Sequence, residues 1–284
     1  MFRVEKISSF DAPGLRPYTT LRRPLEHRHE GIFVAESEKV VRRLLESRIE
    51  VVSLVLSEDW LAQFRPLLER RPENIIVYLV EKRLLEKMVG FTMFQGVLAV
   101  ARVPAPPTVD DILRQRTGPM LLAALDGLAN AENLGVLVRN CVAFGVNGLV
   151  VGETSSSPWL RRAVRNSMGA VFHLPIVELA APHGRRERRG AASTLAQALA
   201  EMRARGVHCV AAHPRADKTA LPQVDFSGDC CMVFGSEGTG ISEPVLAACN
   251  EAAAIRTSPL VDSLNVGVAA AVFLYEAARQ RAKL

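Results

Sequence analysis

The chain has 284 residues with 49% hydrophobic and 23% charged content, which is enough for two folded domains and excludes a disordered protein. The formal charge of +5 and the isoelectric point near 9.1 fit a polyanionic partner without requiring one. No stretch reaches the roughly 18 charge-free apolar residues that a membrane span needs, and the N-terminus lacks the apolar segment of a signal peptide. We therefore expect a cytoplasmic protein with no membrane partner.

Cysteine spacing argues against a structural metal or a disulfide framework. The five cysteines, at positions 141, 209, 230, 231 and 249, show no C-x-x-C or His-rich pattern. Such a pattern is what a zinc site would require. We therefore expect buried thiols in a reducing compartment and no metal.

The first 103 residues predict a small α/β domain. A strand entering an amphipathic helix covers 31–48, and further strands cover 51–57, 75–80 and 96–103. Helix patterns separate them at 61–71 and 81–90. The proline-rich run RVPAPP (102–107) and the polar residues after it indicate a linker over 104–118.

The C-terminal domain, residues 119–284, predicts a second α/β fold. Strands over 120–125, 148–151, 173–177, 207–212, 230–234 and 252–256 alternate with helices over 134–144, 158–168, 193–205, 243–249 and 264–282. This alternation predicts a parallel sheet covered by helices on both faces. A Rossmann domain would show G-x-G-x-x-G after the first strand, where this chain has DGLANAENLG (126–135).

Three polar clusters interrupt this apolar pattern. They are NLGVLVR (133–139), FGSEGTG (234–240) and SLN (263–265). Taken singly they have ordinary explanations, because Asn133 and Ser263 could cap helices, Arg139 could lie on a surface, and Glu237 could pair with an arginine. The glycines of the second cluster would also let the backbone turn tightly with its amides exposed to a ligand.

Together, in this order, the clusters resemble the three signature motifs of the SpoU (TrmH) family of SPOUT RNA 2'-O-ribose methyltransferases. GSEGTGIS (235–242) resembles the second motif almost residue for residue, and IRTSPLVDSLNVGVAAAVFLYE (255–276) resembles the third. The resemblance implies a C-terminal domain with a deep trefoil knot that binds S-adenosyl-L-methionine. It also implies a preceding substrate-binding domain, a homodimer, and structured RNA as substrate, with rRNA favoured over tRNA.

The resemblance also implies roles for individual residues. Active-site roles fall to Asn133, Arg139, Glu237, Ser263 and Asn265, and cofactor contacts fall to Gly235, Gly238, Ile255 and Leu264. We expect Arg139 to grip a phosphate in bidentate fashion and to stabilise the developing alkoxide. Deprotonation of a guanidinium is strongly disfavoured, so the proton acceptor stays unassigned. No metal is required, because the sulfonium methyl group is already electrophilic.

The chain departs from the family pattern at two places. RTSP (256–259) replaces the usual proline-methionine loop, and Gly267 stands where the family commonly has serine. The first change predicts an altered loop at the adenine.

The window 161–189 holds seven arginines against two glutamates. The arginines are Arg161, Arg162, Arg165, Arg185, Arg186, Arg188 and Arg189. RNSMGA (165–170) resembles a recurrent SpoU segment, so we expect Arg161, Arg162 and Arg165 to face RNA. The run RRERR (185–189) could contact phosphate or be only a solvated loop. His27, Arg28 and His29 are further exposed candidates in the first domain.

Other functions remain open beside an rRNA methyltransferase. A tRNA 2'-O-methyltransferase would share every motif, and an RNA-binding ribosome-assembly factor could keep the fold without methylating. An unrelated α/β protein could bind a nucleotide phosphate at a helix N-terminus. Intact polar positions in all three clusters favour the enzyme.

Overall fold

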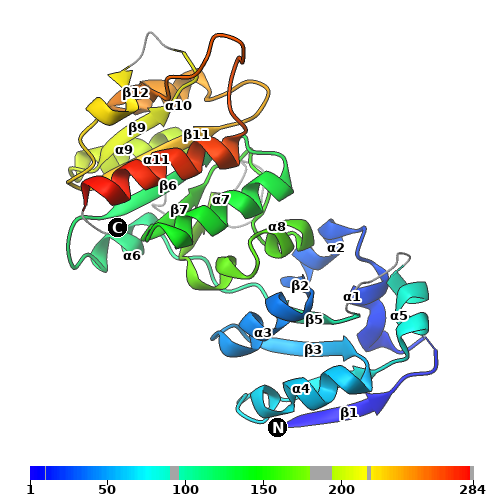
Figure 1. Cartoon of the computed structure of the whole chain (residues 1–284). Helices are drawn as coiled ribbons and strands as arrows, with labels where there is room; N and C mark the ends of the chain where they lie inside the picture. The colour runs from blue at the N-terminus through cyan, green and yellow to red at the C-terminus, as the bar shows by residue number, and fades with distance from the viewer. Residues whose placement is uncertain (10, 90–95, 180–193, 216–218, 282–284) are drawn as a thin grey trace. The chain divides into compact units, whose positions relative to one another are not determined.

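The computed structural model of the chain describes residues 1–9, 11–89, 96–179, 194–215 and 219–281. Backbone contacts divide it into two compact units (Figure 1). Unit 1 comprises Met1–Ala105 and Pro158–His173, and unit 2 comprises Pro106–Ser157 and Leu174–Leu284.

The described residues of unit 1 form a five-stranded sheet in the order β1-β4-β3-β5-β2. β1, β4 and β3 run parallel, whereas β5 is antiparallel to both β3 and β2. The strands are β1 (Phe2–Lys6), β2 (Ile32–Glu36), β3 (Val51–Leu56), β4 (Ile75–Leu79) and β5 (Leu98–Arg102). The helices are η1 (Pro13–Leu15), α1 (Arg16–Thr19), α2 (Pro24–His29), α3 (Glu38–Glu46), α4 (Glu58–Leu68), α5 (Lys82–Val89), α8 (Arg161–Asn166) and η2 (Ala170–His173).

Apolar side chains bury both faces of this sheet. All five residues of β2 are buried, and α3 packs against β2 through a face that includes Val40, Val41 and Leu44. Other apolar residues join Leu15 and Tyr18 of η1 and α1 in a second cluster. There the buried Tyr18 hydroxyl lies 2.8 Å from Ser53 Oγ, which satisfies two polar groups inside the core.

The segment Pro158–His173 lies in unit 1, although the sequence pattern placed it inside the C-terminal domain. Its α8 packs against β2, and the ring of Phe33 lies 5.1 Å from that of Trp159 and 5.8 Å from that of Phe172. Glu36, buried at the end of β2, accepts hydrogen bonds from Arg161 and, at 2.9 Å, from Arg165. An aromatic cluster and a buried carboxylate therefore join this segment to β2.

The described residues of unit 2 form a seven-stranded sheet in the order β10-β12-β9-β11-β6-β7-β8, and every pairing in it is parallel. This confirms the predicted α/β class with a parallel sheet. The strands are β6 (Leu121–Asp126), β7 (Gly148–Val151), β8 (Ile176–Glu178), β9 (His208–Ala212), β10 (Thr219–Ala220), β11 (Cys230–Gly235) and β12 (Glu251–Ala254). The helices are α6 (Val109–Arg114), α7 (Ala131–Ala143), α9 (Leu195–Ala204), η3 (Leu221–Gln223), α10 (Glu243–Ala248) and α11 (Val266–Gln280).

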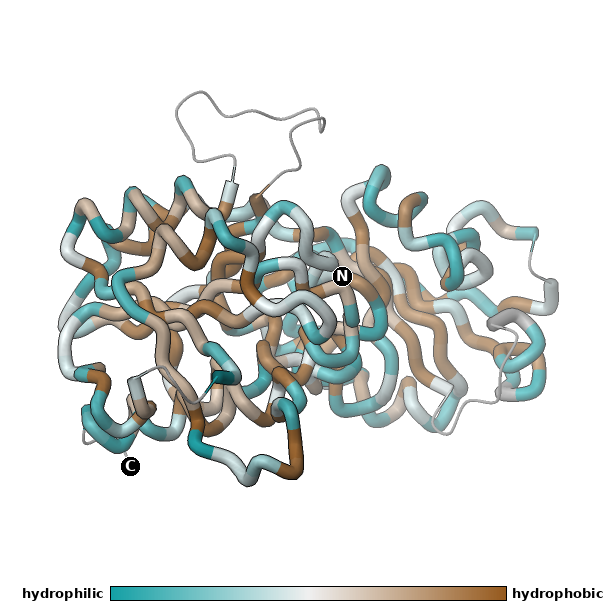
Figure 2. The backbone as a smooth tube through the Cα atoms, turned by 90° about the horizontal axis from the view of Figure 1, so that it is seen from above, coloured by the Kyte–Doolittle hydropathy of each residue, from teal (hydrophilic) through white to brown (hydrophobic). Residues whose placement is uncertain are grey.

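Helices cover both faces of the sheet in unit 2. Cys231 and Val233 of β11 pack in one cluster with residues of α6, α9 and α10. The next residue, Phe234, points to the other face, where its ring makes an edge contact with Phe273 of α11 at 5.8 Å. In Figure 2 the hydrophobic residues follow the strands, while hydrophilic residues are concentrated on the outer helices and loops. β11 is therefore apolar throughout, as expected of a strand buried on both faces.

The stretch 104–118, expected to link two domains, contains α6 of unit 2. Thr108 and Asp111 form a capping box at its start. Val109 and Ile112 lie in the core of unit 2. A short helix with two apolar residues is difficult to distinguish from a linker by periodicity alone.

All five cysteines are described residues, and each is a free, buried thiol. Burial raises the pKa of the Cys141 thiol to about 12, which keeps it protonated and unreactive. Within the described ranges, no helix is long and apolar enough to cross a membrane.

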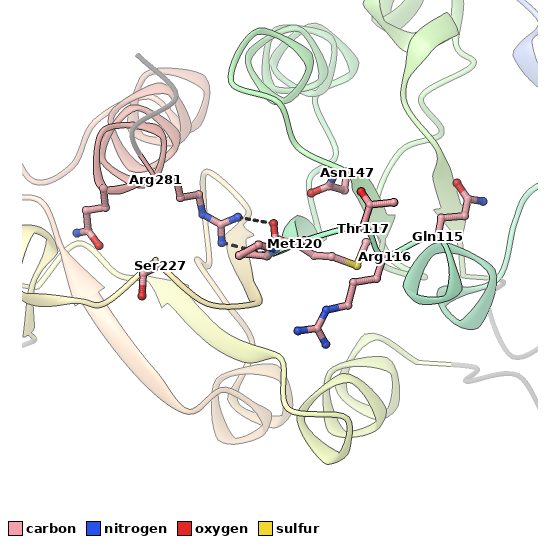
Figure 3. A pocket seen from close by; sticks show the side chains of 10 residues that line it. Gln115, Arg116, Thr117, Met120, Asn147, Ser227 and Arg281 are labelled. Atoms are coloured by element: carbon pink, nitrogen blue, oxygen red, sulfur yellow. Dashed lines mark hydrogen bonds between the residues drawn. The ribbon is translucent and has the colours of Figure 1, made fainter.

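The amino-terminal edge of the unit 2 sheet is closed by Arg281, just after α11. Its guanidinium donates to the carbonyl oxygens of Phe226 (2.8 Å), Pro119 (3.0 Å), Met120 (3.0 Å) and Gly228 (2.5 Å). A cavity of about 460 Å³ adjoins this network at the starts of β6, β7 and β11 (Figure 3). The backbone occupies all three nitrogens of the guanidinium, so Arg281 fastens α11 to the sheet.

Replacing this arginine should destabilise unit 2. Arg281→Ala leaves part-buried carbonyl oxygens without their donor, so we expect the free energy of unfolding to fall by about 2–3 kcal/mol in urea titration. Arg114→Ala, which removes an exposed arginine of unit 2 paired with Asp110, is the control and should change it far less. Equal losses from the two variants would contradict the anchoring role.

Candidate active site

The polar clusters lie at the carboxyl-terminal edge of the unit 2 sheet. β6 and β11 are neighbours, and their last residues, Asp126 and Gly235, are paired in register. Loops that leave the carboxyl ends of adjacent parallel strands lie on the same edge, where ligands of open α/β sheets bind. The loop entering α7 and the glycine loop after β11 are thereby placed together.

The cap of α7 is Asn130, and not Asn133. Asn130 Oδ1 accepts hydrogen bonds from the backbone N–H of Glu132 (2.8 Å) and of Asn133 (3.2 Å). The helix begins at Ala131, so the capping explanation of Asn133 is wrong. Its side-chain amide, in the first turn, is available for another role.

The glycine loop after β11 is a tight turn that exposes Glu237. Ser236 and Gly240 exchange backbone hydrogen bonds of 3.0 and 3.1 Å across it. A Cβ at Gly235 would lie 2.3 Å from the carbonyl carbon of Gly240 and 2.4 Å from the nitrogen of Ile241. Only glycine fits such a close backbone approach.

Buried Asp126 at the end of β6 fastens the far end of this loop. Its Oδ2 accepts a hydrogen bond of 2.7 Å from the backbone N–H of Ser242, just before α10. The sequence motifs did not single out this aspartate. Its position as the last residue of a buried strand is the signal that could have identified it.

The N-cap of α11 is Asn265, and the capping prediction for Ser263 is wrong. Asn265 Oδ1 accepts a hydrogen bond of 2.9 Å from the backbone N–H of Gly267. Ser263 lies two residues earlier in the loop, is exposed, and makes no hydrogen bond to a described residue.

Hydrogen bonds between side chains join the three clusters. Asn265 Nδ2 donates to Asn133 Oδ1 at 3.2 Å, across 132 residues of sequence, and Asn133 Nδ2 donates to Glu237 Oε1 at 2.6 Å. The cap sets the direction, because a backbone N–H can only donate and so requires Asn265 Oδ1 as its acceptor. Each amide then presents its NH₂ group to the next residue. This hydrogen-bond chain, from Asn265 through Asn133, ends on the Glu237 carboxylate.

Arg139 and Ser263 are not joined to this hydrogen-bond chain. Arg139 lies on α7, six residues after Asn133, is exposed, and makes no hydrogen bond or ion pair with another described residue. An exposed arginine with five unused donors can bind an anionic ligand in bidentate geometry.

The predicted cofactor-contact residues fall at two places. Gly235 and Gly238 belong to the glycine loop, and no described atom beyond the adjoining residues lies within 4 Å of a Cβ built at Gly238. Leu264 is half-buried beside Asn265. Ile255 instead lines a cavity of about 570 Å³ with η3 and the middle of α11, which no residue of the hydrogen-bond chain lines.

Asn140 is a residue of this region that the sequence motifs missed. Its Nδ2 donates a hydrogen bond of 2.7 Å to the carbonyl oxygen of Gly267. A Cβ at Gly267 would lie 2.8 Å from Cγ1 of Val136. The serine common in the family would therefore not fit here without movement of Val136, which explains the departure at this position.

The predicted RNA-facing arginines lie in unit 1. Arg161 is 18% exposed and Arg165 is 56% exposed, and both pair with Glu36. Arg162 is exposed. The run 185–189 lies outside the described residues.

The prediction for His27 is wrong, because this residue is buried. Its Nε2 lies 3.1 Å from Thr20 Oγ1, and desolvation lowers the pKa of its imidazole. Arg28 and His29 are exposed, as predicted.

Comparison with known proteins identifies the family. Residues 120–275, which contain all three clusters, match the model of the SpoU rRNA methylase family. The chain belongs to this family. The SpoU resemblance of the three motifs is thereby confirmed.

Curated relatives of the SpoU chain carry related names. A protein of Mycobacterium avium named "uncharacterized tRNA/rRNA methyltransferase" is 32% identical over 73% of this chain. The matched part spans only 63% of that protein's length. A Mycobacterium bovis protein of similar name is 29% identical over 97% of this chain and 92% of its own length.

Solved structures share the fold. The crystal structure of an AdoMet-bound rRNA methyltransferase from Sinorhizobium meliloti has a TM-score of 0.79 at 22% identity, covering 97% of this chain and 98% of that one. A putative RNA methyltransferase of the TrmH family from Porphyromonas gingivalis has a TM-score of 0.75 at 24% identity, covering 98% and 100%. These likenesses cover both units of the SpoU chain.

No metal-binding group emerges from the described part of the chain. Nowhere in it do three or more His, Cys, Asp or Glu side chains gather in an arrangement that could hold a metal ion.

The two possible caps of α11 can be distinguished by their effect on stability. Asn265→Ala removes the acceptor for the Gly267 N–H, so we expect the free energy of unfolding to fall by about 1 kcal/mol in urea titration. Ser263→Ala is the matched control and should leave it unchanged. A larger loss from Ser263→Ala would show that the serine caps the helix in solution.

Proposed function

We propose that this chain is an S-adenosylmethionine-dependent methyltransferase that modifies a ribose 2'-hydroxyl in structured RNA, with rRNA favoured over tRNA. The observation that carries the proposal is the hydrogen-bond chain from Asn265 through Asn133 to Glu237, which unites the three SpoU motifs at one edge of the sheet. Family membership over residues 120–275 supports the same activity.

The residues at this edge fit the cofactor. Gly235 lets the loop close on its own backbone at Gly240 and Ile241, and Gly238 leaves open space beside the loop, so a nucleoside can approach the Gly238 backbone without side-chain obstruction. We assign the cofactor contacts to these glycines with Ile255 and Leu264. S-adenosylmethionine supplies an electrophilic methyl group when bound, and a fold neighbour from Sinorhizobium meliloti is described as AdoMet-bound.

The reaction is one of orientation and charge stabilisation. We assign to Arg139 the phosphate next to the reacting ribose, because its guanidinium is exposed and has no partner among the described residues. The same cation stabilises negative charge that develops on the 2'-oxygen. We exclude it as the proton acceptor, since a guanidinium does not deprotonate in proteins.

Glu237, Asn133, Asn265 and Ser263 supply the polar groups around the ribose in this proposal. Oε1 of Glu237 is held by Asn133, while its Oε2 makes no hydrogen bond to a described residue and can accept one from a sugar hydroxyl. Ser263 presents an exposed hydroxyl in the loop before Asn265. The hydrogen bonds that hold Glu237, Asn133 and Asn265 in place lower the entropic cost of aligning the reactants.

The path of the chain before α11 supports the trefoil knot. β9 and β11 lie between β12 and β6 in the sheet. The loop 255–265 leaves β12, and its last residue bonds to Asn133 at the start of α7, which follows β6. It therefore crosses the carboxyl ends of two intervening strands, and a long crossing of this kind supports the proposed knot.

The arginines of unit 1 are assigned to the RNA backbone. Arg162 and Arg165 are exposed, and the Glu36 carboxylate fixes one side of Arg165 while leaving other donors for phosphate. Arg161 is more deeply placed and also pairs with Glu36. Contacts of this kind supply affinity that is independent of sequence and sensitive to salt.

The proposed reaction predicts methyl transfer to RNA. Purified protein with methyl-labelled S-adenosylmethionine and total RNA from cells lacking the gene should yield labelled 2'-O-methylnucleoside in a discrete rRNA. Label in tRNA would redirect the substrate assignment, and a labelled base would overturn the ribose assignment. Cofactor binding without transfer to any RNA would favour a non-methylating assembly factor.

Arg139 variants provide the internal control for this assay. Arg139→Ala should lower turnover by about 10²–10³-fold, as removal of one stabilising donor does in other enzymes. Its affinity for S-adenosylmethionine in calorimetry should be unchanged. Arg139→Lys keeps the charge but loses the bidentate fork, so its turnover should lie between those of the wild type and the alanine variant. Full turnover by Arg139→Ala would remove this residue from the mechanism.

We also propose that the chain forms a homodimer through the outer face of α7 and α11. Val268, Val272 and Tyr275 recur at helical spacing on α11 and are 38–52% exposed, and Val136 of α7 is 37% exposed. A contiguous apolar stripe on two packed helices is typical of a protein interface. The opposite face of α11 is buried in unit 2.

The dimer predicts a mass of twice the 31.0 kDa chain in light scattering. Val272→Asp places a charge in the stripe, so we expect a shift to the mass of one chain. Leu25→Asp, at a residue 68% exposed in unit 1, is the control and should leave the mass unchanged. A single-chain mass for the wild type would refute the dimer.

A further inference from the structure

The peptide group of Gly267 is held from both sides in the first turn of α11. Its N–H donates to Asn265 Oδ1 at 2.9 Å, and its carbonyl oxygen accepts from Asn140 Nδ2 at 2.7 Å. The first partner is the helix's own cap, whereas the second lies on α7. One buried peptide thus connects the start of α11 to the neighbouring helix.

The absence of a side chain at Gly267 permits a close contact between the two helices at this point. A Cβ at position 267 would lie 2.8 Å from Val136 Cγ1 and 3.2 Å from Asn265 Oδ1. A side chain here would require Val136 Cγ1 or the capping amide to move. Gly267 therefore sets the separation of α7 and α11, and the hydrogen bond from Asn140 sets their register.

Asn140 shares a helix face with Asn133 of the hydrogen-bond chain. Positions 133, 136 and 140 recur at i, i+3 and i+7 along α7, so they lie on one side of it. The same helix that Asn140 fixes to Gly267 presents Asn133 to Asn265 at 3.2 Å and to Glu237 at 2.6 Å. A slide of α7 that breaks the first contact also changes the others.

We infer that Asn140 is a positioning residue, which through Gly267 holds α7 in the register where Asn133 meets Asn265 and Glu237. Its own side-chain amide is bonded to the carbonyl oxygen of Gly267. It acts on the reaction only by fixing α7, which also carries Arg139. The inference rests on the proposed function, because methyl transfer is one of its readouts.

A second contact keeps the helix pair together when Asn140 is changed. The rings of Phe144, at the end of α7, and Tyr275 make an edge contact at 6.4 Å. Phe144 follows Asn140 by four positions, so this contact lies about one turn farther along the helix. Loss of the Asn140 bond should therefore loosen the start of α11 without unfolding unit 2.

The test replaces the donor with an acceptor of the same shape. Asn140→Asp sets a carboxylate oxygen against the Gly267 carbonyl, and we expect the single-turnover rate of methyl transfer to fall about tenfold, which corresponds to about 1.4 kcal/mol of activation free energy. The dissociation constants for S-adenosylmethionine and for RNA should stay within about twofold of wild type. Asn140→Ala should behave in the same way.

Asn147→Ala is the matched control. Asn147 Oδ1 accepts a hydrogen bond of 2.9 Å from the backbone N–H of Leu121, at the opposite edge of the sheet. Its loss should lower the melting temperature about as much as Asn140→Ala does and leave the rate unchanged. An unchanged rate in both Asn140 variants, or an equal loss in Asn147→Ala, would overturn the inference.

Hydrogen exchange measured by mass spectrometry separates this inference from the proposed function. Amides of 262–270 should exchange faster in Asn140→Asp than in wild type or Asn147→Ala, whatever the catalytic outcome. Unchanged exchange there would refute the role of Asn140. Faster exchange with no methyl transfer by the wild type would leave the positioning contact in place and remove the proposed reaction.

Discussion

The backbone N–H of Gly267 determines the direction of the side-chain hydrogen bonds that join Asn265, Asn133 and Glu237. Since that group can only donate, Asn265 must offer its oxygen, and its NH₂ group must turn to Asn133. Asn133 then donates to Glu237. A carboxylate can end this series of hydrogen bonds, because it only accepts. A charged acceptor held by an amide donor is a stronger contact than a neutral pair.

The parallel sheet of unit 2 brings these groups together. Its strand order places β11 beside β6, so the glycine loop and α7 leave the same edge. The return of the chain from β12 to α11 adds the third cluster. At the amino-terminal edge, Arg281 donates hydrogen bonds to the carbonyl oxygens of Phe226, in the loop before β11, and of Met120, just before β6. At the amino-terminal edge, Arg281 thus bonds to backbone carbonyls, whereas the carboxyl-terminal edge presents polar side chains.

The proposed function gives one charged segment of unit 1 both a structural and a functional role. Glu36 is buried, and a buried carboxylate is costly unless it is paired. Arg161 and Arg165 meet that requirement. In the proposed function, the exposed part of Arg165 and the exposed Arg162 contact the RNA backbone. Pairing with Glu36 therefore orients the segment instead of excluding it from RNA binding.

Much of the architecture was readable from hydrophobic pattern, and the exceptions have local causes. β11 was predicted because a continuous apolar run is typical of a strand buried on both faces. β1 was missed because FRVEK alternates charged and apolar residues and is only partly buried at the edge of its sheet. α6 was read as linker because only two of its six residues, Val109 and Ile112, are buried.

The sequence by itself determined the family, the α/β class and the identity of the polar clusters, because residue types and their spacing are properties of the chain alone. The tertiary structure decided which asparagines cap α7 and α11, since neighbouring polar residues compete for the same backbone N–H groups. It also decided the partners of Asn133, Asn140 and Arg165, which lie 104 to 132 residues away. Such partners depend on strand order and helix register, and periodicity encodes neither.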